Sequence, residues 1–152
     1  MNRWSVVLLY TLSGSCMASG NGWPDYLQQI ASADPATIQA LPAKVLRIGH
    51  NLDDEHAAQL ATAIGIALIK DPVNVLKATD VIETYTDELQ QRFGTSLICS
   101  IPGQNEYPQE EIEGYFSRAE LALVDAGIPG KDCLNTMRDT FAEIRQGVNG
   151  HK

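Results

Sequence analysis

The segment Asp53–Lys70, DDEHAAQLATAIGIALIK, places the strongest constraint on the fold of this chain. Acidic residues at its start and a lysine at its end match the polarity of an α-helix dipole. Its second half, Ala61–Ile69, is apolar on nearly every side of a helix. A helix without a polar face has to be covered by other elements. We therefore expect this helix to lie in the middle of a helical domain.

Most of the other segments also carry apolar residues at helical spacing. We expect helices that begin at Pro24 and Pro35, a long helix over residues 71–94, another from Pro108 to Gly127, and a last one over residues 131–146. The best strand candidate is Ser96–Ile101, but no alternating pattern of useful length supports a sheet. The predicted fold class is all-α, a compact domain of several helices.

Three prolines at helix starts raise the question of an internal repeat. Pro35, Pro72 and Pro108 are separated by 37 and 36 residues, and DPATIQAL aligns with DPVNVLKA. This period is typical of stacked helical hairpins of the HEAT or armadillo kind. Asp-Pro is also an ordinary helix start, because aspartate caps the first turn and proline suits the first helical position. The sequence leaves both explanations open.

Residues 1–20 have the layout of a secretory signal peptide. Met1–Arg3 is basic, Trp4–Leu12 is apolar, and small residues follow up to Gly20. The apolar run is about half of the roughly 20 residues that cross a bilayer, so we expect no membrane span. Cys16 lies in an imperfect lipobox, and we favour cleavage after Gly20, which discards it, over lipid anchoring. Residues 21–152 then form a single all-helical domain in the periplasm.

Removal of Cys16 leaves an even pair of cysteines, Cys99 and Cys133. Disulfides persist in exported proteins, and the chain has no C-x-x-C motif of the kind that serves redox catalysis. We therefore predict a structural Cys99–Cys133 disulfide. By the loop-entropy relation, a bridge of this span contributes about 3–4 kcal/mol to stability.

The charge of the predicted mature chain is strongly negative. It carries 10 basic and 19 acidic side chains, a net charge of −9, because only Arg3 leaves with the signal peptide. Such a charge argues against nucleic acid or an anionic membrane surface as a partner. It favours association with a cationic protein, although an acidic surface also simply keeps a protein soluble.

The sequence offers little support for an enzyme. HNLDDEH groups His50, Asp53, Asp54, Glu55 and His56, residue types that bind zinc or transfer protons. The six-residue offset between the histidines would place them on different faces of a helix, unlike the pair in H-E-x-x-H. We predict no catalytic residue, no metal site and no cofactor. A small metal-dependent hydrolase that uses His50, Asp54 and His56 is the least favoured alternative.

A candidate partner-binding surface lies in NEYPQEEIEG. Glu110 and Glu111 fall in the first turn after Pro108, and Glu106 and Tyr107 come just before it. Acidic residues suit a helix start for electrostatic reasons alone. A displayed tyrosine beside carboxylates is also the kind of surface that anchors on a basic partner. We select Glu106, Tyr107, Glu110 and Glu111 as the predicted partner-binding residues.

These features together, an acidic and exported helical domain with one disulfide, resemble the periplasmic immunity proteins of type VI secretion amidase effectors. The resemblance is one of general plan and rests on no motif. It implies that the protein binds a peptidoglycan amidase and occludes its substrate groove, and that homodimers can occur. The alternative is a periplasmic helical adaptor or chaperone-like module that binds other proteins.

Overall fold

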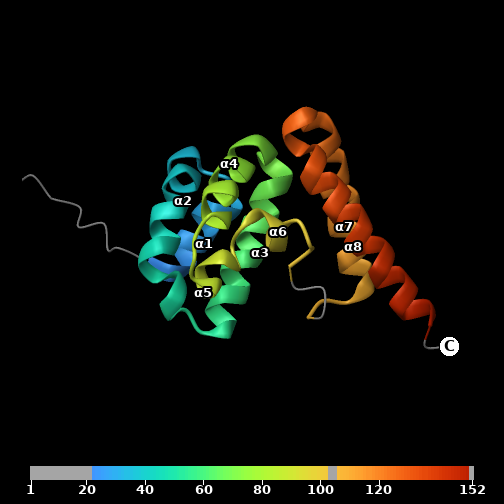
Figure 1. Cartoon of the computed structure of the whole chain (residues 1–152), viewed down its shortest axis with the longest axis horizontal. Coiled ribbons are helices and arrows are strands. Elements are labelled where there is room, and N and C mark those ends of the chain that lie inside the picture. The colour runs from blue at the N-terminus through green and yellow to red at the C-terminus, as the bar shows by residue number, and fades with distance from the viewer. Residues whose placement is uncertain (1–21, 103–105, 151–152) are drawn as a thin grey trace, which may run out of the picture.

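The computed structural model describes residues 22–102 and 106–150. The predicted signal peptide and Cys16 lie outside these residues. The described part of the chain is helical, without strands, and the all-α prediction is confirmed (Figure 1). Its elements are α1 Gly22–Ala31, α2 Pro35–Ile48, η1 Gly49–Asn51, α3 Asp54–Lys70, α4 Pro72–Glu83, α5 Glu88–Gln91, α6 Thr95–Ile98, α7 Gln109–Ala126, η2 Ile128–Gly130 and α8 Lys131–Asn149.

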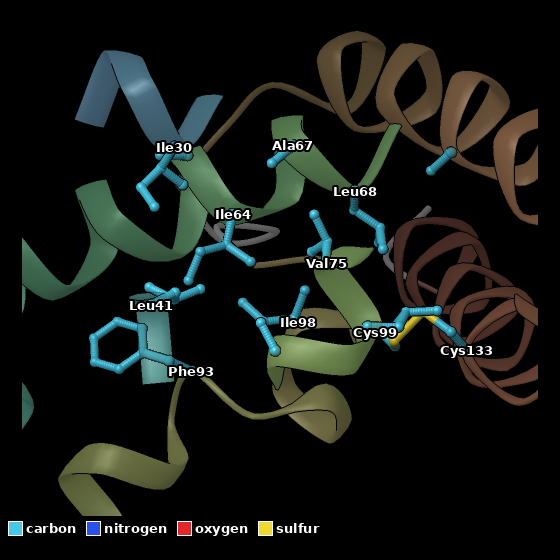
Figure 2. Packing of buried hydrophobic residues seen from close by; sticks show 14 of the residues in the cluster. Ile30, Leu41, Ile64, Ala67, Leu68, Val75, Phe93, Ile98, Cys99 and Cys133 are labelled. Carbon is cyan, nitrogen blue, oxygen red and sulfur yellow. A yellow bond between two sulfur atoms is a disulfide. The ribbon is translucent and has the colours of Figure 1, made fainter. Parts of the chain in front are cut away.

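Helix α3 is the centre of the fold, as its apolar sequence predicts. It packs against α1, α4, α6 and α7. Leu60, Ile64, Ala67 and Leu68 are fully buried on it. Figure 2 shows Ile64 and its neighbours on α3 among side chains contributed by the surrounding helices. Each buried leucine or isoleucine contributes about 1.5–3 kcal/mol by leaving water.

The first four helices form two stacked hairpins. Helix α1 packs on α3, and α2 packs on α4, so that equivalent helices of the two hairpins lie together. Pro35 and Pro72 begin α2 and α4, the second helix of each hairpin, and Asp34 and Asp71 cap them through their side chains. The aligned Asp-Pro segments thus occupy matching places in a repeat-like stack.

Pro108 does not continue that series. It is the N-cap of α7, which packs against α3 and pairs with α8. Pro108 therefore introduces the first helix of a hairpin, whereas Pro35 and Pro72 introduce the second. The α7–α8 hairpin lies at the opposite end of the molecule from α1 and α2 (Figure 1). Helix α7 ends where predicted, at Gly127, whose positive φ of 68° suits glycine.

The prediction of one helix over residues 71–94 is wrong, because local capping interrupts it. Helix α4 ends at Glu83, and the hydroxyl of Thr84 donates to the Val81 carbonyl at 2.7 Å. Asp87 then caps the short α5. Glu83 accepts from the backbone N–H of Ser96 at 3.0 Å and so caps α6 from outside. Residues of the strand candidate Ser96–Ile101 belong partly to α6.

The predicted disulfide is present in the fold. Cys99 and Cys133 are bonded, with their Cα atoms 5.2 Å apart (Figure 2). Both cysteines are buried. Cys99 follows α6 and Cys133 lies in the first turn of α8, so the bond fastens the α7–α8 hairpin to the rest of the domain. In the described ranges, 22–102 and 106–150, no helix has both the length and the hydropathy to cross a membrane.

Candidate functional site

Tyr107 lies between two neighbouring hollows on the surface. The larger, of about 480 Å³, opens between α3 and α7, and the smaller, of about 360 Å³, lies toward the start of α3. Thr62 and Tyr107 line both hollows, so the two are continuous at these residues. Tyr107 is 40% exposed. We call the pair of hollows the Tyr107 groove.

The larger hollow has a mainly apolar lining. Helix α3 approaches α7 here, and the chain just after α6 closes one side. The apolar lining residues are Ala61, Gly65, Ile66, Ile101, Pro102 and Ile112. An apolar concavity with a few polar groups at its edge is the usual form of a binding site in proteins.

The smaller hollow has an acidic rim. Its charged residues are Asp54 and Glu55, from the first turn of α3, and Glu106. Glu111, in the first turn of α7, adds a fourth carboxylate at the edge of the larger hollow. Because two different segments bring these like charges together beside Tyr107, the groove carries a negative potential that attracts cations.

Arg118 is the one basic residue lining the groove within the described chain. It lies on α7, two turns after Glu111, and borders only the larger hollow. The smaller hollow is thus lined by carboxylates without a basic residue among its described lining residues, whereas the larger hollow combines an apolar lining with Glu111 and Arg118.

Arg92 fixes the chain that leads into the acidic rim. Its Nη2 donates to the carbonyl oxygens of Gly49 at 2.9 Å and Leu52 at 2.8 Å. Its Nη1 also lies 3.9 Å from Asp54 Oδ1. Asp53 then caps α3, accepting from the backbone N–H of His56 at 2.8 Å. This bond to the carboxylate holds the pKa of Asp53 below its ordinary value.

Tyr115 forms the floor of the larger hollow. Its hydroxyl donates to the carbonyl oxygen of Gly65 at 3.0 Å, which links α7 to α3. Burial raises the pKa of Tyr115 well above the ordinary tyrosine value, since ionisation would place a charge away from water. Tyr115 is therefore a neutral structural support for the groove at physiological pH.

The structure brings together three of the four predicted partner-binding residues. Glu106, Tyr107 and Glu111 line the groove, whereas Glu110 is exposed beside it and lines neither hollow. Asp54, Glu55 and the apolar floor were not predicted as parts of this surface. The acidic start of α3 was visible in the sequence, but its closeness to Tyr107 depends on the packing of α7 against α3.

The histidine cluster is divided by a change of backbone. His50 lies in η1, and His56 lies in the first turn of α3, after the extended residues Leu52 and Asp53. The Nδ1 atom of His56 is 2.7 Å from Asp53 Oδ1. The His56 ring packs edge-on against the Trp23 ring, with 5.6 Å between the ring centroids. Within the described residues, no three histidine, cysteine or acidic side chains converge as metal ligands would.

No family model, curated protein or solved structure matches this chain.

Proposed function

We propose that this protein is exported to the periplasm and binds a positively charged protein partner through the Tyr107 groove. The observation that carries the proposal is the gathering of Asp54, Glu55, Glu106 and Glu111 around one half-exposed tyrosine. Tyrosine is one of the residues that most often dominate binding energy at protein interfaces.

The charges and the apolar floor would serve different stages of binding. Exposed carboxylates accelerate encounter with a cationic surface, an effect that weakens as salt rises. Burial of Tyr107 and of the apolar lining then slows dissociation, which is where most affinity differences arise. A net charge of −9 for residues 21–152 acts in the same direction as the local carboxylates.

For the partner, we favour a secreted peptidoglycan amidase, which this protein would neutralise as an immunity protein. The predicted export, the acidic charge and the disulfide support this choice. Binding would occlude the amidase and deny it the peptides of the cell wall. Because the Tyr107 groove is concave, the amidase would contribute the projecting element at this contact, rather than receive a projecting loop from this protein.

A periplasmic helical adaptor is the second candidate. It is favoured by the stacking of α1 on α3 and of α2 on α4, since stacked hairpins often form extended surfaces that bind other proteins. Both candidates use the same groove, but only the immunity protein is expected to inhibit an enzyme.

Inhibition of a neighbouring amidase tests the proposal. The protein is produced from its full gene, recovered from the periplasm and added to any secreted amidase that is found encoded beside it, with isolated peptidoglycan as substrate. We expect complete inhibition at one equivalent, lost in Tyr107→Ala and retained in Val124→Ala, which alters an exposed α7 residue outside the groove. Full amidase activity in excess protein, or a gene neighbourhood without an amidase, would overturn the immunity function in favour of the adaptor.

A further inference from the structure

We propose that the partner is recognised through a short extended segment with an apolar anchor and a basic residue about three positions away from it. The inference rests on the proposed function and specifies what the Tyr107 groove selects. The apolar anchor would enter the larger hollow, and the basic side chain would meet the carboxylates of the smaller one.

The apolar anchor follows from the shape and lining of the larger hollow. Ala61 carries only a small side chain on α3, and Ile101 and Ile112 supply apolar walls. A volume of about 480 Å³ accommodates a large side chain together with part of its backbone. An aliphatic or aromatic side chain gains most here because it replaces water against apolar surface.

The basic residue follows from the rim of the smaller hollow. Asp54, Glu55 and Glu106 line this hollow, and no basic residue of the described chain lines it, although Arg92 Nη1 lies 3.9 Å from Asp54 Oδ1. An arginine or lysine at this place would form ion pairs with these exposed carboxylates, whereas an acidic side chain would meet like charge. Arg118, which lines the larger hollow, disfavours a second cation there.

The spacing follows from helix geometry. Ala58 lies at the smaller hollow and Gly65 at the larger one, and both are on α3. At 1.5 Å per residue, this stretch of helix rises roughly 10 Å. An extended chain covers that distance in about three residues. The two hollows together thus predict a partner segment with a basic residue and an apolar residue at a fixed separation, which neither hollow alone would require.

Selection from a random peptide library tests the inference without knowledge of the partner. The probe is a phage library of random peptides about 12 residues long. This length is well above the spacing of about three residues expected between the basic residue and the apolar anchor. The target is the full chain recovered from the periplasm. We expect enriched peptides with arginine or lysine about three positions from a large apolar residue. Affinity should fall by about tenfold or more when either residue is replaced by alanine.

Three variants of the protein locate the binding. Thr62→Trp, which fills the junction of the hollows, should abolish binding, and Val124→Trp on α7 outside the groove should not. Glu55→Lys/Glu106→Lys should reverse the charge preference, whereas Asp125→Lys/Glu143→Lys, with the same change in net charge at exposed sites, should preserve it. Circular dichroism verifies that each variant is folded.

Enrichment of acidic or uncharged peptides, or binding that survives Thr62→Trp, would overturn the inference. These results leave the amidase assay untouched, because a partner can bind this surface without an extended segment. Conversely, basic-apolar peptides bound in the groove would support the inference even if the neighbouring amidase were not inhibited.

Discussion

The hydroxyl of Tyr115 donates to the carbonyl oxygen of Gly65 at 3.0 Å and so joins α7 to α3 beneath the Tyr107 groove. The two residues are 50 positions apart in the sequence. A Cβ atom at Gly65 would lie 3.1 Å from the Tyr115 hydroxyl oxygen, closer than ordinary contact. The absence of a side chain at Gly65 therefore allows α7 to approach α3 at this distance.

Gly65→Ala should destabilise the fold although alanine is the better helix former. Its methyl group would push Tyr115 away and weaken the bond between α7 and α3, at a cost of about 1–3 kcal/mol. Urea denaturation measures the free energy of unfolding. Gly147→Ala is the matched control, since nothing lies within 4 Å of its added Cβ. This variant should be more stable than the wild type by up to about 1 kcal/mol, because alanine is the better helix former. A more stable Gly65→Ala protein would contradict the close packing described.

Two tyrosines should make the fold sensitive to alkali. Burial raises the pKa of Tyr26 to about 12, partly offset by Arg47, and burial raises the pKa of Tyr115 further. A tyrosine in the unfolded chain ionises near pH 10. The stability that these two tyrosines contribute is therefore fully present below about pH 10, the pKa of tyrosine in the unfolded chain. It is lost as the pH rises toward their pKa values in the folded protein.

Urea denaturation at increasing pH measures this loss, and the absorbance of tyrosinate follows the ionisation. Tyr26→Phe/Tyr115→Phe should reduce the decline of stability above about pH 10, because phenylalanine does not ionise. An equal decline in the wild type and the double variant would show that other groups govern alkaline unfolding.

Loss of the disulfide should loosen the α7–α8 hairpin. Cys99→Ala/Cys133→Ala is expected to lower the free energy of unfolding by about 3–4 kcal/mol. Amide hydrogen exchange should increase first in α7 and α8, which the bond fastens to α6.

Peptide mapping without reductant must also recover Cys99 linked to Cys133 from the native protein. Two free thiols in protein taken from the periplasm would contradict the predicted disulfide and weaken the proposal of export.

Arg92→Lys should loosen the start of α3, which carries part of the acidic rim, while preserving the positive charge at residue 92. Lysine cannot reproduce the planar guanidinium that reaches the carbonyls of both Gly49 and Leu52. Each partly buried carbonyl that loses its donor costs about 1–3 kcal/mol. Hydrogen exchange should therefore rise at the start of α3. Unchanged exchange there would mean that Asp53 alone holds this helix start.

Helix positions were largely predictable because apolar spacing and Asp-Pro starts are local signals. Pro35 and Pro72 begin helices as expected, and the apolar helix α3 is central. The break after Glu83 was not predicted, because its cause combines a local cap at Thr84 with a contact from Glu83 to Ser96, which lies 13 residues further on. Apolar periodicity alone does not report such competing polar contacts.

The candidate site was predictable only in part. The acids beside Tyr107 are neighbours in sequence, so the pattern identified Glu106 and Glu111. Asp54 and Glu55 join them through the packing of α7 on α3, a long-range contact that no local pattern encodes. The apolar hollow depends on the same packing and on the small side chain of Ala61. The groove is thus a product of tertiary structure, although its charged residues lie in segments that the sequence marks as acidic.

A quantitative pull-down from native envelope extract at moderate salt shows whether the Tyr107 groove captures an amidase through its carboxylates. The tagged wild type, Glu55→Lys/Glu106→Lys and Asp125→Lys/Glu143→Lys proteins are compared, and bound proteins are identified by mass spectrometry. We expect one stoichiometric cell-wall amidase with the wild type and the Asp125/Glu143 control, and its loss with the Glu55/Glu106 variant. Equal recovery of that partner by all three proteins, or recovery of only a structural envelope protein, would contradict the proposed function.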